Sequence, residues 1–399
     1  MKNVGISSGF GQILSCGGLR GPDWTYWTEE DEINQICGGC RDARRIEMKA
    51  AIIGGGFAGN MHAAAIRSCG IELAAVVTTR EESARRFAEE WNIPRWGTAA
   101  ELALDDDIDA VHICTPPSTH AKYAKAALLA GKNVFCEKPL CFSTAEAYEL
   151  AELAEKSGKS CTVTYNVRYH MAVQKARELI LGGTFGRPLL IHGSYLQEFH
   201  VLPANYDWRY DPELSGSMRA VTEIGSHWID TAQYISGLKV TDVSAFFGNF
   251  FPERIVKNGV MDRVRPGDTD PDFEKIRVNS EDAACVTLRY EGGAMGNVML
   301  SEISPGRGNR LFLEITCENG NLWWNEEDNN VLKTAVRGDG VRSEIFAFGN
   351  GYNDTFASLM HNFYEGREVP TFREAAGIVE VCSAIAASAE NNSEWTKVS

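Results

Sequence analysis

Apolar runs of strand length alternate with stretches of helical periodicity from Lys49 to about Arg168. Ala84, Phe87 and Trp91, for example, recur at the three- and four-residue spacing of one helix face. The pattern predicts strands at residues 50–53, 73–78, 110–114, 133–136 and 161–165, and helices at residues 60–69, 82–91 and 119–130, with a further helix capped by Ser143. Because strand and helix alternate strictly, we expect a doubly wound parallel sheet of the α/β class.

The alternation ends near residue 168, and the rest of the chain is richer in strands. β-rich segments at residues 189–195, 240–250, 283–290, 293–301 and 311–317 are separated by turn residues. Helical patterns interrupt them at residues 172–181 and 223–235 and close the chain at residues 355–364 and 375–389. Strands joined by tight turns are typical of an antiparallel sheet, so we expect an α+β domain with a large, mostly antiparallel sheet.

These patterns divide the chain into three parts: an N-terminal extension at residues 1–47, a first domain at 48–168 and a second domain at 169–399. The extension is rich in Gly, Trp and Cys and has no sustained period. Within it, Cys37 and Cys40 have the spacing of two zinc ligands, but Cys16 is the only other cysteine nearby. Two ordinary thiols in a Gly-rich turn are the preferred interpretation, and no metal site is predicted.

Composition and charge exclude several classes of protein. Hydrophobic residues make up 44% of the chain and charged residues 23%, which is ordinary for globular proteins and excludes wholesale disorder. Lys plus Arg number 39 and Asp plus Glu 54, giving a net charge of −15, so we expect no nucleic-acid partner. No apolar stretch reaches the roughly 18 residues of a membrane helix, and the N-terminus lacks the apolar core of a signal peptide. Eleven scattered cysteines indicate free thiols in a reducing compartment, so we expect a cytoplasmic protein without a membrane partner.

A glycine-rich turn follows the first predicted strand. Gly54, Gly56 and Gly59 fit the dinucleotide fingerprint at the point where a strand gives way to a helix. In this motif the first glycine permits the turn, the second lets the backbone approach a pyrophosphate, and the third lets helix and strand pack closely. Phe57 and Ala58 open the helix, whose N-terminal N–H groups would face the phosphates. We therefore expect NAD(P) to bind at these five residues, and the first domain to be a Rossmann domain.

The end of the second strand bears on the choice between NAD and NADP. An acid there, about 20 residues after the glycines, usually binds the ribose 2′-hydroxyl of NAD. This chain has Thr79 and Arg80 instead. The main repulsion against a 2′-phosphate is then missing and Arg80 could pair with it, although Arg80 could equally stack on the adenine of NAD. The sequence leaves the choice open and favours NADP slightly.

Four further segments combine residues in motif-like order. They are Thr115-Pro116-Pro117-Ser118-Thr119-His120, Gly131-Lys132-Asn133-Val134, Glu137-Lys138-Pro139-Leu140 and Glu223-Ile224-Gly225-Ser226-His227-Trp228-Ile229-Asp230. With the glycine-rich turn they resemble the signatures of the Gfo/Idh/MocA family of NAD(P)-dependent oxidoreductases, over nearly everything from Met48 to the C-terminus. The resemblance implies a Rossmann domain followed by a domain whose open sheet commonly forms subunit interfaces, so we expect a homo-oligomer. It also implies that the cofactor is lined by Thr115, Pro116, Pro117, His120, Glu137 and Lys138.

The resemblance further implies a catalytic group. The Lys of the family's Glu-Lys-Pro motif lies beside the nicotinamide and the reacting hydroxyl, and here it is Lys138. The family also places an Asp and, four residues later, a His over the substrate; the matching residues are Glu223 and His227. Four residues make one helical turn, so both side chains share a face, and an imidazole can take the hydroxyl proton as hydride leaves. Glu in place of Asp departs from the family pattern and leaves the contacts of Glu223 open, while Asp230 could orient His227 or be a surface acid.

The remaining candidates lie at and after the domain junction. Arg168 and Tyr169 belong to a segment that matches the family, where Arg168 could contact cofactor or substrate. Gln197, Trp208 and Arg209 lie in stretches that mix aromatic and hydrogen-bonding side chains, as polyol ligands require. Tyr169, Gln197, Trp208, Arg209 and His227 form the expected substrate-binding set, although strand packing and a solvated loop explain most of these residues nearly as well.

Together these features predict an NAD(P)-dependent dehydrogenase. It would transfer hydride between nicotinamide and a secondary hydroxyl of a sugar, glycoside or cyclic polyol, with C3 of a glucoside as one such position. Two alternatives stay open. One is a glycosidase of the same fold that oxidises its substrate transiently with bound NAD, and the other is a non-catalytic NAD(P)-binding regulator, which loss of the Lys or His would have favoured.

Overall fold

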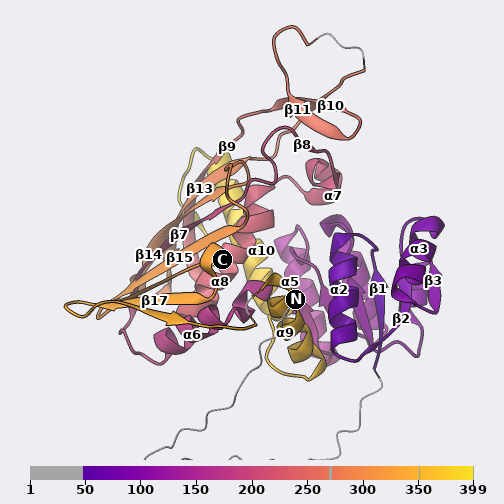
Figure 1. Ribbon diagram of the computed structural model, residues 1–399, viewed down its shortest axis with the longest axis horizontal. Helices are drawn as coiled ribbons and strands as arrows, with labels where there is room; N and C mark the ends of the chain where they lie inside the picture. The colour runs from indigo at the N-terminus through magenta and orange to yellow at the C-terminus, as the bar shows by residue number, and fades with distance from the viewer. Residues whose placement is uncertain (1–47, 269–271, 350, 399) are drawn as a thin grey trace, which may run out of the picture. The chain divides into compact units, whose positions relative to one another are not determined.

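The computed structural model describes residues 48–268, 272–349 and 351–398, drawn as coloured ribbons in Figure 1. The extension with Cys37 and Cys40 lies outside the described residues. In the described part of the chain, no helix is long and apolar enough to cross a membrane.

The first region forms a six-stranded parallel sheet. Its strands are β1 (Lys49–Ile53), β2 (Glu72–Val77), β3 (Arg95–Gly97), β4 (Ala110–Ile113), β5 (Asn133–Cys136) and β6 (Cys161–Val163), in the spatial order β3-β2-β1-β4-β5-β6. They are connected through α2 (Phe57–Ser68), α3 (Glu81–Trp91), α4 (His120–Leu129) and α5 (Thr144–Ser157), with 3₁₀ turns η1 (Ala100–Leu104) and η2 (Pro117–Thr119). This order is that of the doubly wound dinucleotide-binding fold, which confirms the expected Rossmann sheet.

The local sequence explains these elements. Ala50 to Ile53 are at most 3% exposed, since helices cover both faces of the sheet, and such a strand needs apolar residues at every position. The Ser143 side chain accepts a hydrogen bond from the N–H of Glu146 and so caps α5, as predicted. Helix α2 begins three residues earlier than expected because the glycine-rich turn leads directly into it, and the short strand β3 was not predicted.

The second region is built on a nine-stranded mixed sheet. Its strands are β7 (Pro188–Leu196), β9 (Val240–Gly248), β13 (Ala283–Tyr290), β14 (Met295–Ser301), β15 (Arg310–Cys317), β16 (Asn321–Asn325), β17 (Val331–Val336), β18 (Gly340–Ile345) and β19 (Thr396–Lys397), in the order β18-β17-β16-β15-β7-β14-β13-β9-β19. Within this sheet only β7 and β14 pair in parallel, and the chain between them is long enough for the crossover that a parallel pair requires. The expected large, mostly antiparallel sheet is confirmed.

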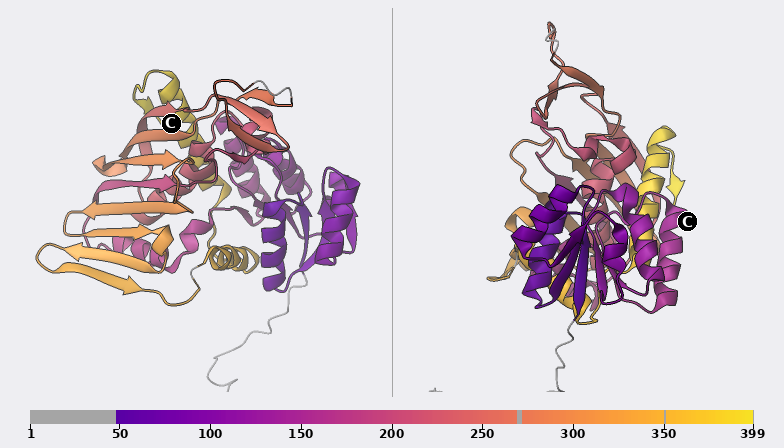
Figure 2. Two further views of the ribbon diagram at one scale, coloured as in Figure 1. Left: turned by 45° about the horizontal axis from the view of Figure 1, so that its top comes forward. Right: turned by 90° about the vertical axis from the view of Figure 1, so that its right-hand side faces the viewer.

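Helices cover one face of this sheet. They are α6 (Met171–Leu181), α8 (Ser226–Ser236) and α10 (Phe372–Glu390), and in the described part of the chain the opposite face is open (Figures 1 and 2). The short elements η3 (Asn166–Tyr169), η4 (Trp208–Tyr210), α7 (Pro212–Ser215), the π-helical turn η5 (Val221–Gly225), η6 (Glu291–Gly293) and η7 (Glu326–Asp328) complete the region.

A small antiparallel sheet projects beside the large one (Figure 1). It consists of β8 (Ala204–Asn205), β10 (Glu253–Lys257), β11 (Val260–Arg263) and β12 (Glu274–Arg277), over a small core that includes Leu202, Met261 and Val278. The apolar pattern did not predict this sheet, because its strands are short and carry charged residues.

Helix α9 (Tyr352–Tyr364) lies late in the chain but packs against α2 and η3. Its residues Phe356, Met360 and Phe363 share one hydrophobic core with Ile52 and Phe135 of the Rossmann sheet. A C-terminal helix therefore belongs physically to the dinucleotide-binding region.

Candidate active site

Two loops meet at the carboxyl ends of β1 and β4, which are neighbours in the sheet. The strand order reverses between them, and dinucleotides bind in the crevice at such a point. The glycine-rich turn follows β1, and the Thr115-Pro116-Pro117 turn follows β4. The fold thus brings both predicted cofactor motifs to one edge of the sheet.

The three glycines differ in what surrounds them. At Gly54, where φ is +110°, a Cβ would lie 2.4 Å from the carbonyl oxygen of Cys114, and at Gly59 it would lie 2.2 Å from that of Gly54. Packing alone restricts these two positions to glycine. At Gly56 a Cβ would meet no atom within 4 Å, and Gly56 is the N-cap of α2 without a side-chain cap. This open backbone before a helix N-terminus fits a ligand pyrophosphate.

Gly56→Ala is therefore expected to leave the fold intact and to weaken dinucleotide binding by about tenfold or more, because the added methyl takes the space of the phosphate. Titration with NAD⁺ and NADP⁺, together with thermal unfolding, measures both effects. Gly59→Ala is the matched control and should lower the unfolding temperature, since its Cβ collides with backbone. If Gly56→Ala binds as tightly as the unaltered protein, the phosphates do not approach this turn.

The other predicted cofactor residues flank the same edge. Phe57 is 73% exposed at the start of α2, with Ala58 half-buried beside it. Thr79 and Arg80 are exposed directly after β2, which runs parallel to β1 and so ends at the same edge. The hydroxyl of Thr78 donates to the carbonyl of Arg80 at 2.8 Å and holds this turn. Both side chains are thus positioned to contact the adenosine end of a dinucleotide.

His120 does not reach the crevice. Its ring is fully buried, and its two nitrogens lie 2.7 Å from the carbonyl oxygen of Pro139 and 2.8 Å from that of Thr115. Thr119 holds the same loop by donating from its hydroxyl to that of Thr115 at 2.7 Å. We correct the expectation of a cofactor contact at His120, because the buried ring instead links the loop after β4 to the loop after β5.

Lys138 joins the Rossmann region to the second region. Its Nζ lies 3.1 Å from Oε2 of Glu223 and 3.1 Å from the carbonyl oxygen of Glu223. The Nε of Arg209 lies 3.4 Å from the same Oε2, and its Nη1 lies 3.0 Å from Asp207. Burial alone would raise the pKa of Glu223, but Lys138 and Arg209 outweigh it and lower the pKa to about 2. Glu223 is therefore ionised, and the four charges alternate in sign along a row.

Glu223 lies on the π-helical turn η5, directly before α8. A π turn widens the helix by one residue and often occurs at functional sites. Here it places both the side chain and the carbonyl oxygen of Glu223 within reach of Lys138. Two of the three N–H groups of Lys138 are used in this way, so one remains to meet a ligand.

His227 lies in the first turn of α8 and is half-buried. Burial, and then the charge of Lys138, lower its pKa to about 3, so the ring is neutral at pH 7. Its Nδ1 is buried without a hydrogen-bond partner in the described chain, and the ring meets Tyr165 edge-on at 5.8 Å. A neutral imidazole has a nitrogen lone pair that can accept a proton from a hydroxyl.

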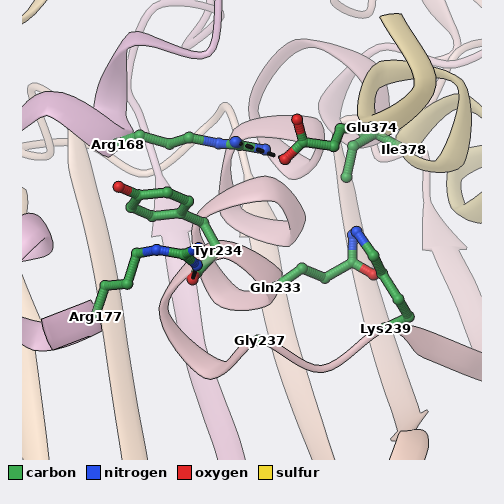
Figure 3. A pocket seen from close by; sticks show the side chains of 8 residues that line it. All are labelled: Arg168, Arg177, Gln233, Tyr234, Gly237, Lys239, Glu374 and Ile378. Atoms are coloured by element: carbon green, nitrogen blue, oxygen red, sulfur yellow. Dashed lines mark hydrogen bonds and ion pairs between the residues drawn. The ribbon is translucent and has the colours of Figure 1, made fainter. Parts of the chain in front are cut away.

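Arg168 lies outside this group. It holds Asp230 with Nε at 2.8 Å and Nη2 at 2.6 Å, and Glu374 with Nη1 at 2.8 Å. It lines a separate cavity of about 170 Å³. Figure 3 shows the Tyr234 ring of this cavity between Arg168 and Arg177. Arg168 links η3 to α8 and α10 away from the Lys138 group, and we correct one expectation: Asp230 pairs with Arg168 instead of orienting His227.

The predicted substrate residues are divided between two places. Arg209 lies on Glu223, and its guanidinium covers the ring of the half-buried Trp208 at 4.5 Å. Tyr169 points away, donating its hydroxyl to the carbonyl of Glu368 at 3.1 Å. Gln197, at the end of β7, donates to Asn309 at 2.5 Å and has no contact with the Lys138 group among the described residues.

Sequence reasoning missed a buried charged cluster near Glu223. Arg219 lies 3.0 Å from Glu302 and pairs with Asp282, and all three are at most 1% exposed. Burial raises the pKa of Glu302 to about 8 against the opposing effect of Arg219, and burial, then Arg219, lower the pKa of His200 to about 3. The only signal in the sequence was a set of acids beside strand-like segments, which does not identify partners.

Comparison with known proteins agrees with this architecture. Residues 48–165 match the oxidoreductase family with an NAD-binding Rossmann fold, and residues 173–323 match the Gfo/Idh/MocA C-terminal domain. Levoglucosan dehydrogenase from Pseudarthrobacter phenanthrenivorans is 30% identical over 88% of this chain and 98% of that protein. Myo-inositol 2-dehydrogenase from Thermotoga maritima is 26% identical over 79% of this chain and 87% of that protein.

A solved structure shows the same fold. Levoglucosan dehydrogenase in complex with NADH and L-sorbose superposes with a TM-score of 0.80 and 28% identity, covering 88% of this chain and 99% of that one. The chain described here therefore belongs to the Gfo/Idh/MocA family and is an NAD(P)-dependent oxidoreductase.

Proposed function

We propose that this protein oxidises a secondary hydroxyl of a sugar, glycoside or cyclic polyol, or reduces the corresponding ketone, with a nicotinamide dinucleotide. The observation that carries the proposal is the Lys138 to Glu223 ion pair at 3.1 Å, with the neutral His227 one turn further along. The names of the relatives, levoglucosan dehydrogenase and myo-inositol 2-dehydrogenase, support the substrate class. C3 of a glucoside is the position we propose within that class.

The residues take the following roles. A bound nicotinamide would supply the hydride chemistry at the carbinol carbon. His227 accepts the hydroxyl proton, and the remaining N–H of Lys138 stabilises the alkoxide. Glu223 holds Lys138 in place through its carboxylate and its carbonyl oxygen. Each of these three side chains is partly exposed.

The charges of the site favour an uncharged substrate. Lys138, Glu223, Arg209 and Asp207 sum to zero and are paired at 3.0 to 3.4 Å. No unpaired cation of this row remains to hold a phosphate or carboxylate. Trp208 offers an aromatic surface for C–H groups, and the paired charges offer hydrogen bonds for hydroxyls.

The test is a substrate screen with purified protein. Levoglucosan, methyl glucosides, glucose, myo-inositol and scyllo-inositol are supplied with NAD⁺ or NADP⁺, reduced nicotinamide is followed by absorbance, and the position of the new ketone is read by NMR. Reduced cofactor should accumulate with at least one of these. Free sugar released from a glycoside without net reduced cofactor would instead indicate the glycosidase, and no turnover of any polyol would refute the substrate class.

For the cofactor we propose a preference for NADP, based on Thr79 and Arg80. The solved levoglucosan dehydrogenase holds NADH, so that relative gives no support to this preference. Thr79→Asp is expected to reverse the order of affinities, because a carboxylate there repels a 2′-phosphate and binds the ribose hydroxyl. Dissociation constants for both cofactors in both proteins decide the question. Tighter NAD⁺ binding by the unaltered protein would contradict the proposal.

We also propose that the open sheet face joins copies of the chain into a homo-oligomer. Phe246, Cys285 and Met299 are paired neighbours across β9, β13 and β14, and Phe246 is 60% exposed. Such an apolar row on one open face is typical of a subunit interface. Light scattering gives the mass in solution, and a monomer at micromolar concentration would contradict this proposal.

We propose a reducing cytoplasm as the location. The eight cysteines in the described part of the chain are free thiols, and most are buried.

A further inference from the structure

A chain of hydrogen bonds leads from the crevice into the Rossmann core. His62 Nε2 lies 3.2 Å from Oε1 of Glu137, His62 Nδ1 lies 2.8 Å from Nδ1 of His112, and His112 Nε2 lies 2.6 Å from the hydroxyl of Tyr364. Both imidazoles are fully buried, and each uses both of its nitrogens. We call His62, His112 and Tyr364 the relay.

The proton positions in the relay follow from one charge. Burial opposes ionisation of Glu137, but the hydrogen bond from His62, together with Lys138, lowers its pKa below the usual value, so its carboxylate accepts hydrogen bonds. His62 then donates from Nε2 to this carboxylate. We assign the proton between the two Nδ1 atoms to His112, so that His62 accepts there.

The remaining bond follows in the same way. Burial, and then His62, hold the pKa of His112 well below its usual value, so the His112 ring is neutral. Its Nε2 is therefore an acceptor, and the Tyr364 hydroxyl is the donor. All three bonds point toward the single carboxylate of Glu137, an arrangement in which each bond strengthens the next.

Aromatic packing fixes the two imidazole rings. His112 stacks between Phe135, with centroids 5.2 Å apart, and Tyr364, at 5.9 Å. His62 meets Phe135 edge-on at 4.9 Å and Phe356 at 5.0 Å. Neither ring can turn without displacing the core, so the hydrogen-bond directions are locked.

The relay ends beside the catalytic lysine. Glu137 follows β5 at the crevice edge, its side chain is 15% exposed, and its Oε2 accepts the N–H of Lys138 at 3.2 Å. Tyr364 ends α9, which lies beyond both regions that match the family, residues 48–165 and 173–323. A helix outside the matched regions is thus connected through His112 and His62 to Glu137, the residue before Lys138.

We propose that His62, His112 and Tyr364 are positioning residues that hold the Glu137 carboxylate ionised and in one orientation toward the bound dinucleotide. They touch neither cofactor nor substrate and act through Glu137. The proposal rests on the dinucleotide binding of the proposed function, but not on its sugar substrate.

The first test is the protonation state of the rings in the full-length protein. Labelling histidine with ¹⁵N and recording long-range ¹H–¹⁵N spectra should show His62 protonated at Nε2 and His112 at Nδ1, with single variants giving the assignment. His112 protonated at Nε2, or His62 protonated at both nitrogens, would overturn the proposal. This measurement needs neither cofactor nor substrate.

The second test removes one hydroxyl. Tyr364→Phe keeps the ring in the core and should weaken NAD(P)⁺ binding by about 3- to 10-fold, the effect of one hydrogen bond, while shifting the His112 nitrogen signals. Tyr148→Phe is the matched control: it removes a hydroxyl that donates to Glu380 at 2.6 Å, outside the relay, and should leave the affinity unchanged. Equal affinity and unshifted His112 signals in Tyr364→Phe would overturn the proposal.

The third test is rescue at His62. A glutamine amide can donate to Glu137, whereas phenylalanine cannot, so His62→Gln should bind NAD(P)⁺ more tightly than His62→Phe. Equal affinities would count against the relay. If the expected proton positions and affinities are found but no sugar or polyol is oxidised, the proposed substrate class fails and the relay stands.

Discussion

Turnover by His227→Ala is expected to be about 10²- to 10⁴-fold lower than by the unaltered enzyme, with dinucleotide affinity nearly unchanged. His227 is the imidazole beside Lys138, and its pKa of about 3 makes it the neutral proton acceptor at pH 7. Its removal leaves the alkoxide stabilised but the proton without an acceptor. Steady-state kinetics with the substrate from the screen, and fluorescence titration with reduced cofactor, measure the two quantities.

His361→Ala is the matched control, because this side chain lies on α9, is 44% exposed and pairs only with Glu365 among the described contacts. It should leave turnover unchanged. Lys138→Ala should also lose about 10²-fold or more, since alkoxide stabilisation is lost. Full activity of either His227→Ala or Lys138→Ala would show that the assigned site is wrong.

The pH profile of activity distinguishes a histidine with this lowered pKa from a histidine with an ordinary pKa. Only the neutral ring accepts a proton, so activity is full above its pKa and is lost as the pH falls through it. With a pKa of about 3, kcat/KM for oxidation should show no limb from His227 near pH 6.5. Lys138 is the charge that lowers this pKa after burial, so the residual activity of Lys138→Ala should decline at a higher pH than that of the unaltered enzyme.

The parts of the fold that could be predicted are those in which burial determines the residue pattern. Strands of the Rossmann sheet are covered on both faces, so they appear as continuous apolar runs such as residues 50–53 and 134–136. Strands β12 and β18 are largely exposed, with charged and apolar residues mixed, whereas β10 is a short strand in which the charged Arg254 is buried beside Ile255 and Val256. An exposed strand does not need apolar residues at regular spacing, so its sequence has no periodic pattern from which the strand could be predicted.

The site was predictable where residues lie close together in sequence. Glu223 and His227 are four residues apart, and the glycine-rich turn is continuous. Arg168 and Asp230 are 62 residues apart, and their ion pair follows only from the packing of η3 on α8. His112 and Tyr364 are 252 residues apart, and nothing in either local sequence indicates the other. Long-range polar pairs of this kind depend on the finished fold.

Glu223→Gln is expected to lower kcat by about 10- to 100-fold, whereas Glu223→Asp should keep activity within about tenfold of the unaltered enzyme. Glutamine keeps the length of the side chain but removes its charge, which leaves Lys138 and Arg209 without their shared partner, 3.1 and 3.4 Å away. Because the side chains of Lys138 and Glu223 are each 15% exposed, water compensates part of this loss, and the effect stays below that of a fully enclosed pair.

Aspartate keeps the charge and shortens the arm by one methylene, while the bond from Lys138 to the carbonyl oxygen of Glu223 involves no side-chain atom and survives in both variants. Lys138 therefore stays near η5, and a small movement of its flexible chain restores the ion pair with Asp but not with Gln. Glu223→Gln should therefore lower kcat and leave the affinity for the dinucleotide nearly unchanged. Since Glu223 raises the pKa of His227, the Gln variant should also show no new decline of activity at acid pH. The measurements are turnover, cofactor affinity and the pH profile of both variants. If Glu223→Gln is as active as the unaltered enzyme, η5 does not belong to the active site.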